Sequence, residues 1–329
     1  MELVFWCLVA AAGTAVTWYG SGLLEGASEQ LAVYHGLPPI VQGSMVAAVG
    51  SSFPELASAV LAILAHGDFE LGVSAIAGSA IFNITVIPAI AAFLSVEPLS
   101  TNRDLVYKEA QFYMVAVALL LLVFSLAVIY APVAGAEGIE GELGRGLALI
   151  PLLAYGLYVF MQWQDTMDFE PEVDPGDVRP ARQWTLLLAS LAVVLAGVEG
   201  IVRAAVRLGG LLDIPSFFWG VTVVAVGTSL PDAFYSVKAV RKGNAVSSMA
   251  NVLGSNVFDL LVAVPAGVLL GGTVVVDFSS AVPIFAGLTL ITVVLFTFMR
   301  TRLVLSRWEG AVLMALYLGF VAWMFAAGT

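Results

Sequence analysis

Two short motifs place carboxylates, hydroxyls, glycine and proline inside long apolar segments. The first is Gly50-Ser51-Ser52-Phe53-Pro54-Glu55, and Gly227-Thr228-Ser229-Leu230-Pro231-Asp232 has the same order. Segments this apolar are typical of membrane spans, where no water is present, so every polar group needs a partner in the protein or in a ligand. A charged side chain at the bilayer centre costs roughly 2.5–3.5 kcal/mol on insertion scales. Because the chain carries this cost twice at matching places, we expect both carboxylates to hold a cation.

A second pair of motifs adds polar groups to the next span of each half. Gly78-Ser79-Ala80-Ile81-Phe82-Asn83 matches Gly254-Ser255-Asn256-Val257-Phe258-Asp259. Ser79 and Asn83, like Ser255 and Asp259, are four residues apart, so each pair shares one face of a helix. The glycine that opens each motif allows close backbone approach to the neighbouring helix.

Proline and glycine predict that the second and seventh spans are broken helices. Pro54 lacks an amide hydrogen and its ring clashes with the preceding turn, and Gly50 adds backbone freedom. We therefore expect the second span to unwind between residues 49 and 55, which frees carbonyl groups such as that of Ala48. The seventh span repeats this arrangement around Pro231, with Ala225 in the equivalent place.

The combined ligand set is all oxygen, with three carboxylates and no His or Cys. Calcium accepts 6–8 oxygen ligands in flexible geometry, whereas soft transition metals prefer other donors. Three ionised carboxylates give the pocket a charge of −3, which one calcium ion with a monovalent ion, or several sodium ions, would neutralise. The pattern therefore predicts a cation exchanger that needs no cofactor. The candidate ligands are Glu55, Asp232, Asp259, Asn83, Ser51, Ser52, Thr228, Ser229, Ser79 and Ser255, with the carbonyl groups of Ala48 and Ala225.

The composition predicts the fold class. Of the 329 residues, 60% are hydrophobic and 11% are charged, whereas soluble domains are about 45–50% apolar and about 25% charged. At about 20 residues per span, ten spans and short loops account for the whole length. We expect an all-α integral membrane protein, with spans at 3–24, 37–65, 71–94, 111–130, 147–163, 184–205, 214–240, 246–270, 281–299 and 308–326.

The spans form two halves that repeat. Three pairs of proline and glycine residues are 177 positions apart: Pro38 and Pro215, Gly43 and Gly220, and Gly50 and Gly227. An odd number of spans per half makes the second copy run in the opposite direction, as in many secondary transporters, whose sites lie at the midplane between broken helices. We divide the chain into a first five-helix repeat (1–163), an acidic cytoplasmic linker (164–183) and an inverted second repeat (184–329).

Charge predicts the orientation and limits the partners. The net charge of −11 argues against a nucleic-acid partner. With both termini outside, ten of the 13 Lys and Arg residues fall on the inside, the bias expected of cytoplasmic loops. We therefore expect a multi-pass protein of the cell membrane that contacts the lipid bilayer. Because Cys7 is the only cysteine, an intramolecular disulfide is excluded.

The four motifs resemble the signature repeats of the sodium/calcium exchanger family of cation/calcium antiporters. The resemblance covers residues 43–94 and 220–270 and the ten-span layout. The second repeat, with its turn Val240-Arg241-Lys242-Gly243, is most similar to the potassium-dependent branch of that family. The resemblance implies calcium extrusion driven by sodium, by alternating access, in a protein with no obligatory protein partner that works as a monomer.

The resemblance also implies roles for individual residues. Glu55 and Asp232 would hold calcium at the centre, Asn83 and Asp259 would complete that centre, and the motif hydroxyls would contribute to calcium or sodium sites. Asp259 matches the acidic residue tied to potassium dependence, but potassium-independent microbial relatives also carry an acid there, so potassium co-transport stays open. The first and sixth spans would slide across the other eight.

Several other interpretations remain open at this point. A calcium/proton antiporter would use the same carboxylates without the hydroxyls, whereas a channel would need a continuous pore and a membrane scaffold would leave the duplicated acids unexplained. An enzyme is disfavoured because no nucleophile–base pair occurs in the apolar core. Glu25 and Glu29, and likewise Glu199 with Arg203, fit either helix-end ion pairs or an ion vestibule. The small-residue motifs also fit simple helix packing.

Overall fold

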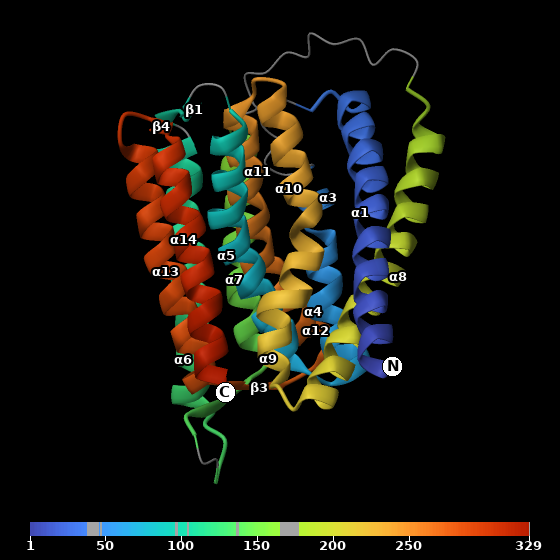
Figure 1. Cartoon of the computed structure of the whole chain (residues 1–329), viewed down its shortest axis with the longest axis vertical. Helices are drawn as coiled ribbons and strands as arrows, with labels where there is room; N and C mark the ends of the chain where they lie inside the picture. The colour runs from blue at the N-terminus through green and yellow to red at the C-terminus, as the bar shows by residue number, and fades with distance from the viewer. Residues whose placement is uncertain are drawn as a thin grey trace.

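The structure, a computed structural model, describes residues 1–37, 46, 48–95, 98–103, 105–135, 138–164 and 178–328. Pro38, Gly43 and linker residues 165–177, which the sequence singled out, lie outside this part. In the described part, the long elements are helices that run along one common axis (Figure 1).

Each half of the chain supplies one set of helices. The first half contains α1 (Glu2–Tyr34), α3 (Ala48–Ser51), α4 (Phe53–His66), α5 (Phe69–Leu94), α6 (Ala110–Tyr130) and α7 (Arg145–Gln164). The second half contains α8 (Pro180–Leu212), α9 (Ser216–Trp219), α10 (Ala225–Arg241), α11 (Ala245–Phe258), α12 (Val264–Gly271), α13 (Phe278–Arg300) and α14 (Arg307–Gly328). Three π-helical segments precede α6, α10 and α12: Leu105–Glu109, Gly220–Val224 and Asp259–Ala263.

The number of membrane-crossing helices agrees with the prediction. Within the described residues, nine helical stretches are long and apolar enough to cross a bilayer, and Phe53–His66 is a shorter apolar helix. These stretches coincide with the ten predicted spans, of which the second is the one built from α3 and α4. Several helices extend beyond the predicted ends; α1 and α8 each contain 33 residues.

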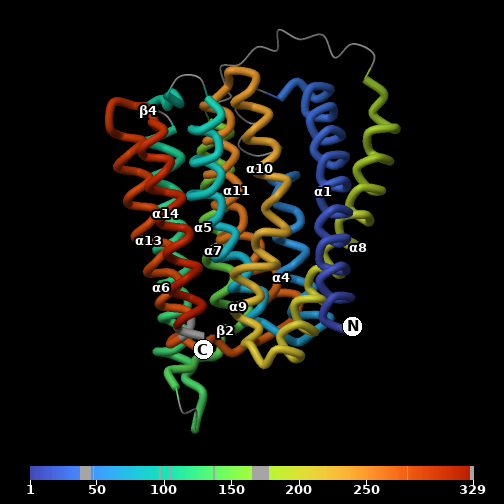
Figure 2. The backbone as a smooth tube through the Cα atoms, viewed as in Figure 1, coloured from blue at the N-terminus to red at the C-terminus, as the bar shows by residue number. Residues whose placement is uncertain are grey.

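The two halves run in opposite directions through the bundle. In Figures 1 and 2, α1 begins and α14 ends at one end, which we call the terminal end. At the opposite end, which we call the linker end, α7 stops and α8 starts. From α3 to α4 the chain runs toward the terminal end, whereas α10, the counterpart of that span, runs toward the linker end. This is the inverted repeat that an odd number of spans per half predicts.

Two short strand pairs tie the halves together at opposite ends of the bundle. At the linker end, β1 (Leu99–Ser100) pairs antiparallel with β4 (Val304–Leu305). At the terminal end, β2 (Glu140–Leu143) pairs antiparallel with β3 (Val274–Asp277). Each pair takes one strand from each half, and the inversion converts one pair into the other. The strands are too short for a sequence pattern to reveal.

Helices α1 and α8 form a separate pair along one side of the bundle (Figure 1). Their backbones meet at Gly13 and Gly197: a β-carbon on Gly13 would lie 2.7 Å from the Gly197 carbonyl oxygen, and one on Gly197 would lie 2.8 Å from the Gly13 carbonyl oxygen. Only glycine permits this approach, because any side chain would overlap the facing helix. Small residues at such contacts are common where membrane helices pack closely.

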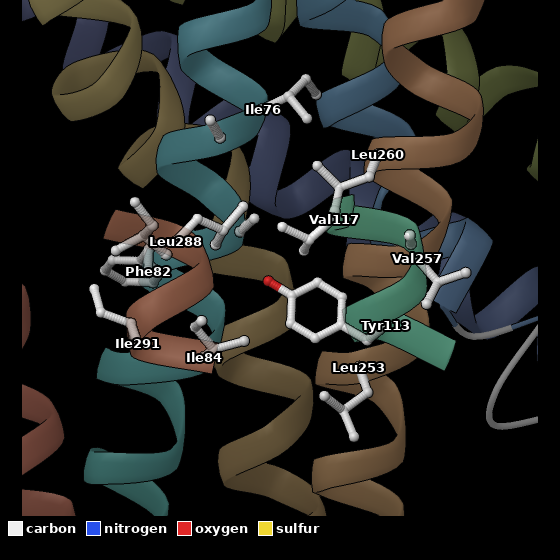
Figure 3. Close-up of a cluster of buried hydrophobic side chains, with 14 of the residues drawn as sticks. Ile76, Phe82, Ile84, Tyr113, Val117, Leu253, Val257, Leu260, Leu288 and Ile291 are labelled. Carbon is white, nitrogen blue, oxygen red and sulfur yellow. The ribbon is translucent and has the colours of Figure 1, made fainter. Parts of the chain in front are cut away.

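The larger buried apolar cluster lies between α5, α6, α11 and α13, on the side away from α1 and α8, and a smaller one joins α8 to α4 and α5. Figure 3 shows the ring of Tyr113, which is fully buried, among Val117, Leu253 and Val257. Helix α5 is central and almost wholly buried, whereas α1, α7 and α14 expose most of their apolar side chains. Exposed apolar surface of this extent is stable in a lipid environment.

Candidate functional site

The second span breaks within its motif, as proline and glycine predicted. Helix α3 ends at Ser51 and α4 starts at Phe53, with Ser52 between them at φ −89° and ψ 3°. Pro54 stands in the first turn of α4, where its missing amide hydrogen costs no helical bond. The break brings Glu55 into the first turn of α4, where it is fully buried.

The seventh span differs from the prediction in where its helix is irregular. Residues 225–241 form a continuous helix, α10, with Pro231 inside it, and the irregularity is the π-helical segment Gly220–Val224, before the motif. The Thr228 hydroxyl donates to the carbonyls of Val224 (3.1 Å) and Ala225 (3.3 Å), so it bonds back to its own helix.

The two backbone ligands expected from the sequence already accept hydrogen bonds. The Ala48 carbonyl accepts from the Ser52 amide at 2.9 Å and from the Ser51 hydroxyl at 3.2 Å. The Ala225 carbonyl accepts from Thr228. Neither is therefore a freed carbonyl, because both helices keep their local hydrogen bonds at these positions.

Glu55 is held by hydroxyls from both halves. Its Oε1 accepts from Ser79 at 3.2 Å and from Ser229 at 3.1 Å, and the hydroxyls of those two serines are 2.6 Å apart. Ser79 comes from α5 in the first half and Ser229 from α10 in the second. A carboxylate of one repeat is thus positioned partly by the other, as expected at a midplane interface.

Asp232 is surrounded in the same way by neutral donors. Its Oδ2 accepts from Asn83 Nδ2 at 2.9 Å, and its Oδ1 accepts from Asn251 Nδ2 at 3.1 Å and from Ser255 at 3.0 Å. Ser51 connects to this group through Asn251 Oδ1 at 3.5 Å and the Ser255 hydroxyl at 3.4 Å. All of these side chains are buried, so the carboxylate receives these hydrogen bonds away from solvent.

Four residues of the cluster keep buried oxygen atoms without a hydrogen-bond partner among the described residues: Ser52 Oγ, Glu55 Oε2, Asn83 Oδ1 and both carboxylate oxygens of Asp259. Buried polar atoms are nearly always paired, and an unpaired one costs about 1–3 kcal/mol, more for a charge. Asp259 also lies near enough to Glu55 and Asp232 for the three charges to interact. The arrangement leaves free oxygen atoms of the type that hard cations bind.

The carboxylates do not converge on one point. Among the described residues, no three side chains of His, Cys, Asp or Glu lie close enough together to form a metal site from those residue types alone. Hydroxyl and amide groups separate Glu55 from Asp232. A cation in this cluster would therefore combine one or two carboxylates with neutral oxygens.

Two asparagines of the cluster were not among the site residues predicted from the sequence. Asn251 bonds Asp232, while Asn256 accepts from Asn83 Nδ2 at 3.1 Å and donates to the Ala80 carbonyl at 3.0 Å. Asn251 has no polar counterpart in the first half, so the repeat could not reveal it. Its spacing of four residues from Ser255 was the available signal, since that places both on one helix face.

The remaining singled-out residues lie elsewhere. Glu199 pairs with Arg203 one turn later at 2.7 Å and meets His66 Nε2 at 3.4 Å, which agrees with the ion-pair interpretation. Gly78 serves close packing, because a β-carbon there would lie 2.6 Å from the Val221 carbonyl oxygen. Glu25 and Glu29 line a separate cavity at the linker end.

Comparison with known proteins supports the architecture and identifies the family. The pattern of the sodium/calcium exchanger protein family matches residues 5–164 and 182–326. A sodium/calcium exchanger of Methanosarcina acetivorans is 27% identical over 97% of this chain and 98% of its own. The solved sodium/calcium exchanger from Methanococcus jannaschii is 24% identical, covers 97% of this chain and 98% of its own, and gives a TM-score of 0.66.

The similarity to the potassium-dependent branch covers only parts of the chain, such as the 125 residues, 35% of the chain, that match a probable sodium/potassium/calcium exchanger of Drosophila melanogaster at 33% identity. The human sodium/potassium/calcium exchanger 4 is 42% identical over 79 residues, which cover 23% of this chain and 12% of that protein. By contrast, the sodium/calcium exchanger pattern spans both repeats, including all four motifs that hold the buried cluster. The chain is a multi-pass membrane transporter that belongs to the sodium/calcium exchanger family.

Proposed function

We propose that this protein exchanges sodium for calcium across the membrane, and that the buried cluster around Glu55 and Asp232 binds both cations. The observation that carries the proposal is the set of buried oxygens on Ser52, Glu55, Asn83 and Asp259 that have no hydrogen-bond partner in the described part of the chain. Carboxylate, hydroxyl and amide oxygens together match the flexible coordination of calcium, and the same neutral groups suit sodium. Relatives over the full chain length include a sodium/calcium exchanger.

The charge of the cluster favours exchange over one-way release. Three buried carboxylates without a neutralising cation would be costly in a bilayer. The change between the two access conformations is therefore more favourable when the cluster holds cations than when it is empty. One calcium ion or several sodium ions lower that cost in the same set of ligands. Competition between two cation loads for one site is the physical basis of an antiporter.

Helices α1 and α8 are the part of the protein that would move relative to the other helices during alternating access. It lies along one side of the bundle and approaches the motif helix α10 through Thr14, whose hydroxyl lies against Gly227. The helices that carry the cluster are tied to one another by hydrogen bonds between α4, α5, α10 and α11. A sliding pair would therefore expose the cluster to one side or the other without dismantling it.

The orientation follows from the basic residues. The helix directions bring all ten Lys and Arg residues assigned to inside loops to the linker end, and Arg145, Arg203 and Arg207 to the terminal end. By the positive-inside rule the linker end faces the cytoplasm and both termini face outward. Labelling of single cysteines at the two ends with a membrane-impermeant reagent in cells tests this orientation.

A flux assay separates sodium from the other driving ions. Purified protein in liposomes is given gradients of sodium, protons or potassium separately, and uptake of radioactive calcium is measured. We expect an outward sodium gradient to drive uptake. Uptake driven by a proton gradient alone would instead indicate a calcium/proton antiporter. Potassium dependence, which rests on Asp259 and on similarity over parts of the chain, would appear as sodium-driven uptake that requires potassium.

A further inference from the structure

Apart from the buried cluster, a polar cavity of about 300 Å3 lies at the linker end between α1, α10 and the start of α11. Its lining includes Glu25 and Glu29 of α1, Tyr235 of α10, Lys242 directly after α10, and Ser247 of α11. Neither glutamate contributes to the buried cluster. Charged side chains and water-accessible volume are present here together, and a further cavity with charged side chains, lined by Glu2 and Arg207, lies at the terminal end of α1 and α8.

One face of α1 extends from this cavity toward the motif helices. The Thr14 hydroxyl stands against Gly227 of α10, and Ser21 and Glu25 follow 7 and 11 residues later, so they share that face. Ser21 is buried, and its hydroxyl has no hydrogen-bond partner among the described residues. The Cα atom of Glu25 lies 3.8 Å from the place where a β-carbon on Gly50 would stand. This face of α1 therefore contacts the motif of the second span near Glu25 and the motif of the seventh span at Thr14.

One face of α11, continued by Asp259 at the start of the next π-helical segment, follows the same course. Ser247, Asn251, Ser255 and Asp259 are spaced by four residues, so their side chains form one polar stripe. At the cavity, Ser247 Oγ meets the Tyr235 hydroxyl at 3.2 Å. One turn deeper, Asn251 Nδ2 donates to Asp232 Oδ1 at 3.1 Å. The stripe thus connects the cavity wall directly to a carboxylate of the buried cluster.

The charged side chains along this course change from positive at the linker end to negative near the buried cluster, which favours inward movement of a cation. Lys238 and Lys242 lie near Glu25 at the linker end, whereas deeper along the course Glu25 interacts with the charge of Asp232. Glu25 is half-buried, so its charge is less screened than that of a surface acid. A cation that leaves water would meet Glu25 before it reaches Asp232, with hydroxyl and amide oxygens on the way.

We propose that this cavity is the linker-side access vestibule for the transported cation and that Glu25 binds a divalent cation transiently before Asp232 does. The inference rests on the proposed function and adds to it a residue that acts from one side of the membrane only. Lys242 opposes Glu25 at the mouth and limits how tightly the vestibule holds the ion.

Transport kinetics measured from each side test the inference. Liposomes are oriented by impermeant labelling of an Arg179→Cys marker, and calcium is varied on one side at a time. We expect Glu25→Gln to raise the half-saturating calcium concentration on the linker side by about five-fold, with no change on the terminal side. Lys242→Gln is expected to lower it. Glu309→Gln removes an acid at the same end, outside the vestibule, and is the matched control that should change neither value.

Cysteine labelling keeps the test informative if Glu25→Gln loses all transport. In a Cys7→Ser background, Ser247→Cys should react with an impermeant cationic thiol reagent from the linker side, and calcium should slow the reaction. An unreactive Ser247→Cys, or a Glu25→Gln protein with normal linker-side half-saturation, would overturn the vestibule. Absence of sodium-driven calcium uptake by the unmodified protein would instead overturn the proposed function.

Discussion

Replacement of Glu55 by glutamine is the cleanest removal of charge that the cluster allows. Oε1 would stay an oxygen and keep the hydrogen bonds from Ser79 and Ser229, while the new amide would take the place of Oε2, which has no partner among the described residues. The substitution therefore preserves the geometry and removes one unit of negative charge. Any loss of cation affinity then reports the charge itself.

The size of the loss follows from Coulomb's law. For calcium about 2.4 Å from a carboxylate oxygen, even the dielectric constant of bulk water gives an attraction of about 3.5 kcal/mol, which corresponds to roughly 300-fold in affinity. A monovalent ion at the same distance would lose about half of that energy, or roughly 20-fold. Because Glu55 is fully buried, its attraction for a cation is screened less than in water, and the cost of keeping the carboxylate charged away from water offsets part of that gain. Glu55→Gln should therefore weaken calcium far more than sodium.

Calorimetric titration in detergent and calcium uptake by liposomes measure the two affinities. Glu109→Gln is the matched control: this carboxylate is also buried, but it accepts from Tyr158 at 2.7 Å and Gln162 at 2.6 Å, away from the cluster. Transport by Glu109→Gln should persist. The reasoning is refuted if Glu55→Gln binds calcium within ten-fold of the unmodified protein, or if sodium and calcium weaken equally.

Three further substitutions separate charge, packing and ion selectivity. Asp232→Asn should abolish calcium exchange and also lower the melting temperature in detergent. The new amide group would face one of the donors that now bond the Asp232 carboxylate, at a cost of about 1–3 kcal/mol. Unchanged stability would contradict the hydrogen-bond assignment. Gly78→Ala should destabilise by about 1–3 kcal/mol, since its β-carbon would meet the Val221 backbone at 2.6 Å, whereas Gly26→Ala, with nothing within 4 Å, should not destabilise. Asp259→Asn should affect calcium less than Glu55→Gln does and change the dependence on sodium or potassium; an unaltered monovalent dependence in the flux assay would remove Asp259 from that role.

Hydropathy and the internal repeat were sufficient to predict most of the architecture. A bilayer permits few solutions for an apolar chain, so about 20 residues per span and an odd number of spans per half lead directly to ten spans in an inverted repeat. The same restriction made polar residues conspicuous: Glu55, Asp232 and Asp259 stood out because the surrounding sequence is apolar. Pro54 likewise predicted the break that the structure has at Ser52.

Only the tertiary structure decided how those residues meet. Pro231 stays inside the continuous helix α10 although the sequence predicted a break there, and the irregular π-helical segment lies upstream of the motif, at Gly220–Val224. Asn251 has no counterpart in the first repeat, so its contact with Asp232 depends on how α10 and α11 pack. Spacing along one chain determines which side chains share a helix face, whereas distances between helices depend on the packing of the whole bundle. For that reason the oxygen-rich chemistry was readable from the sequence, and the separation of the carboxylates by hydroxyls and amides was not.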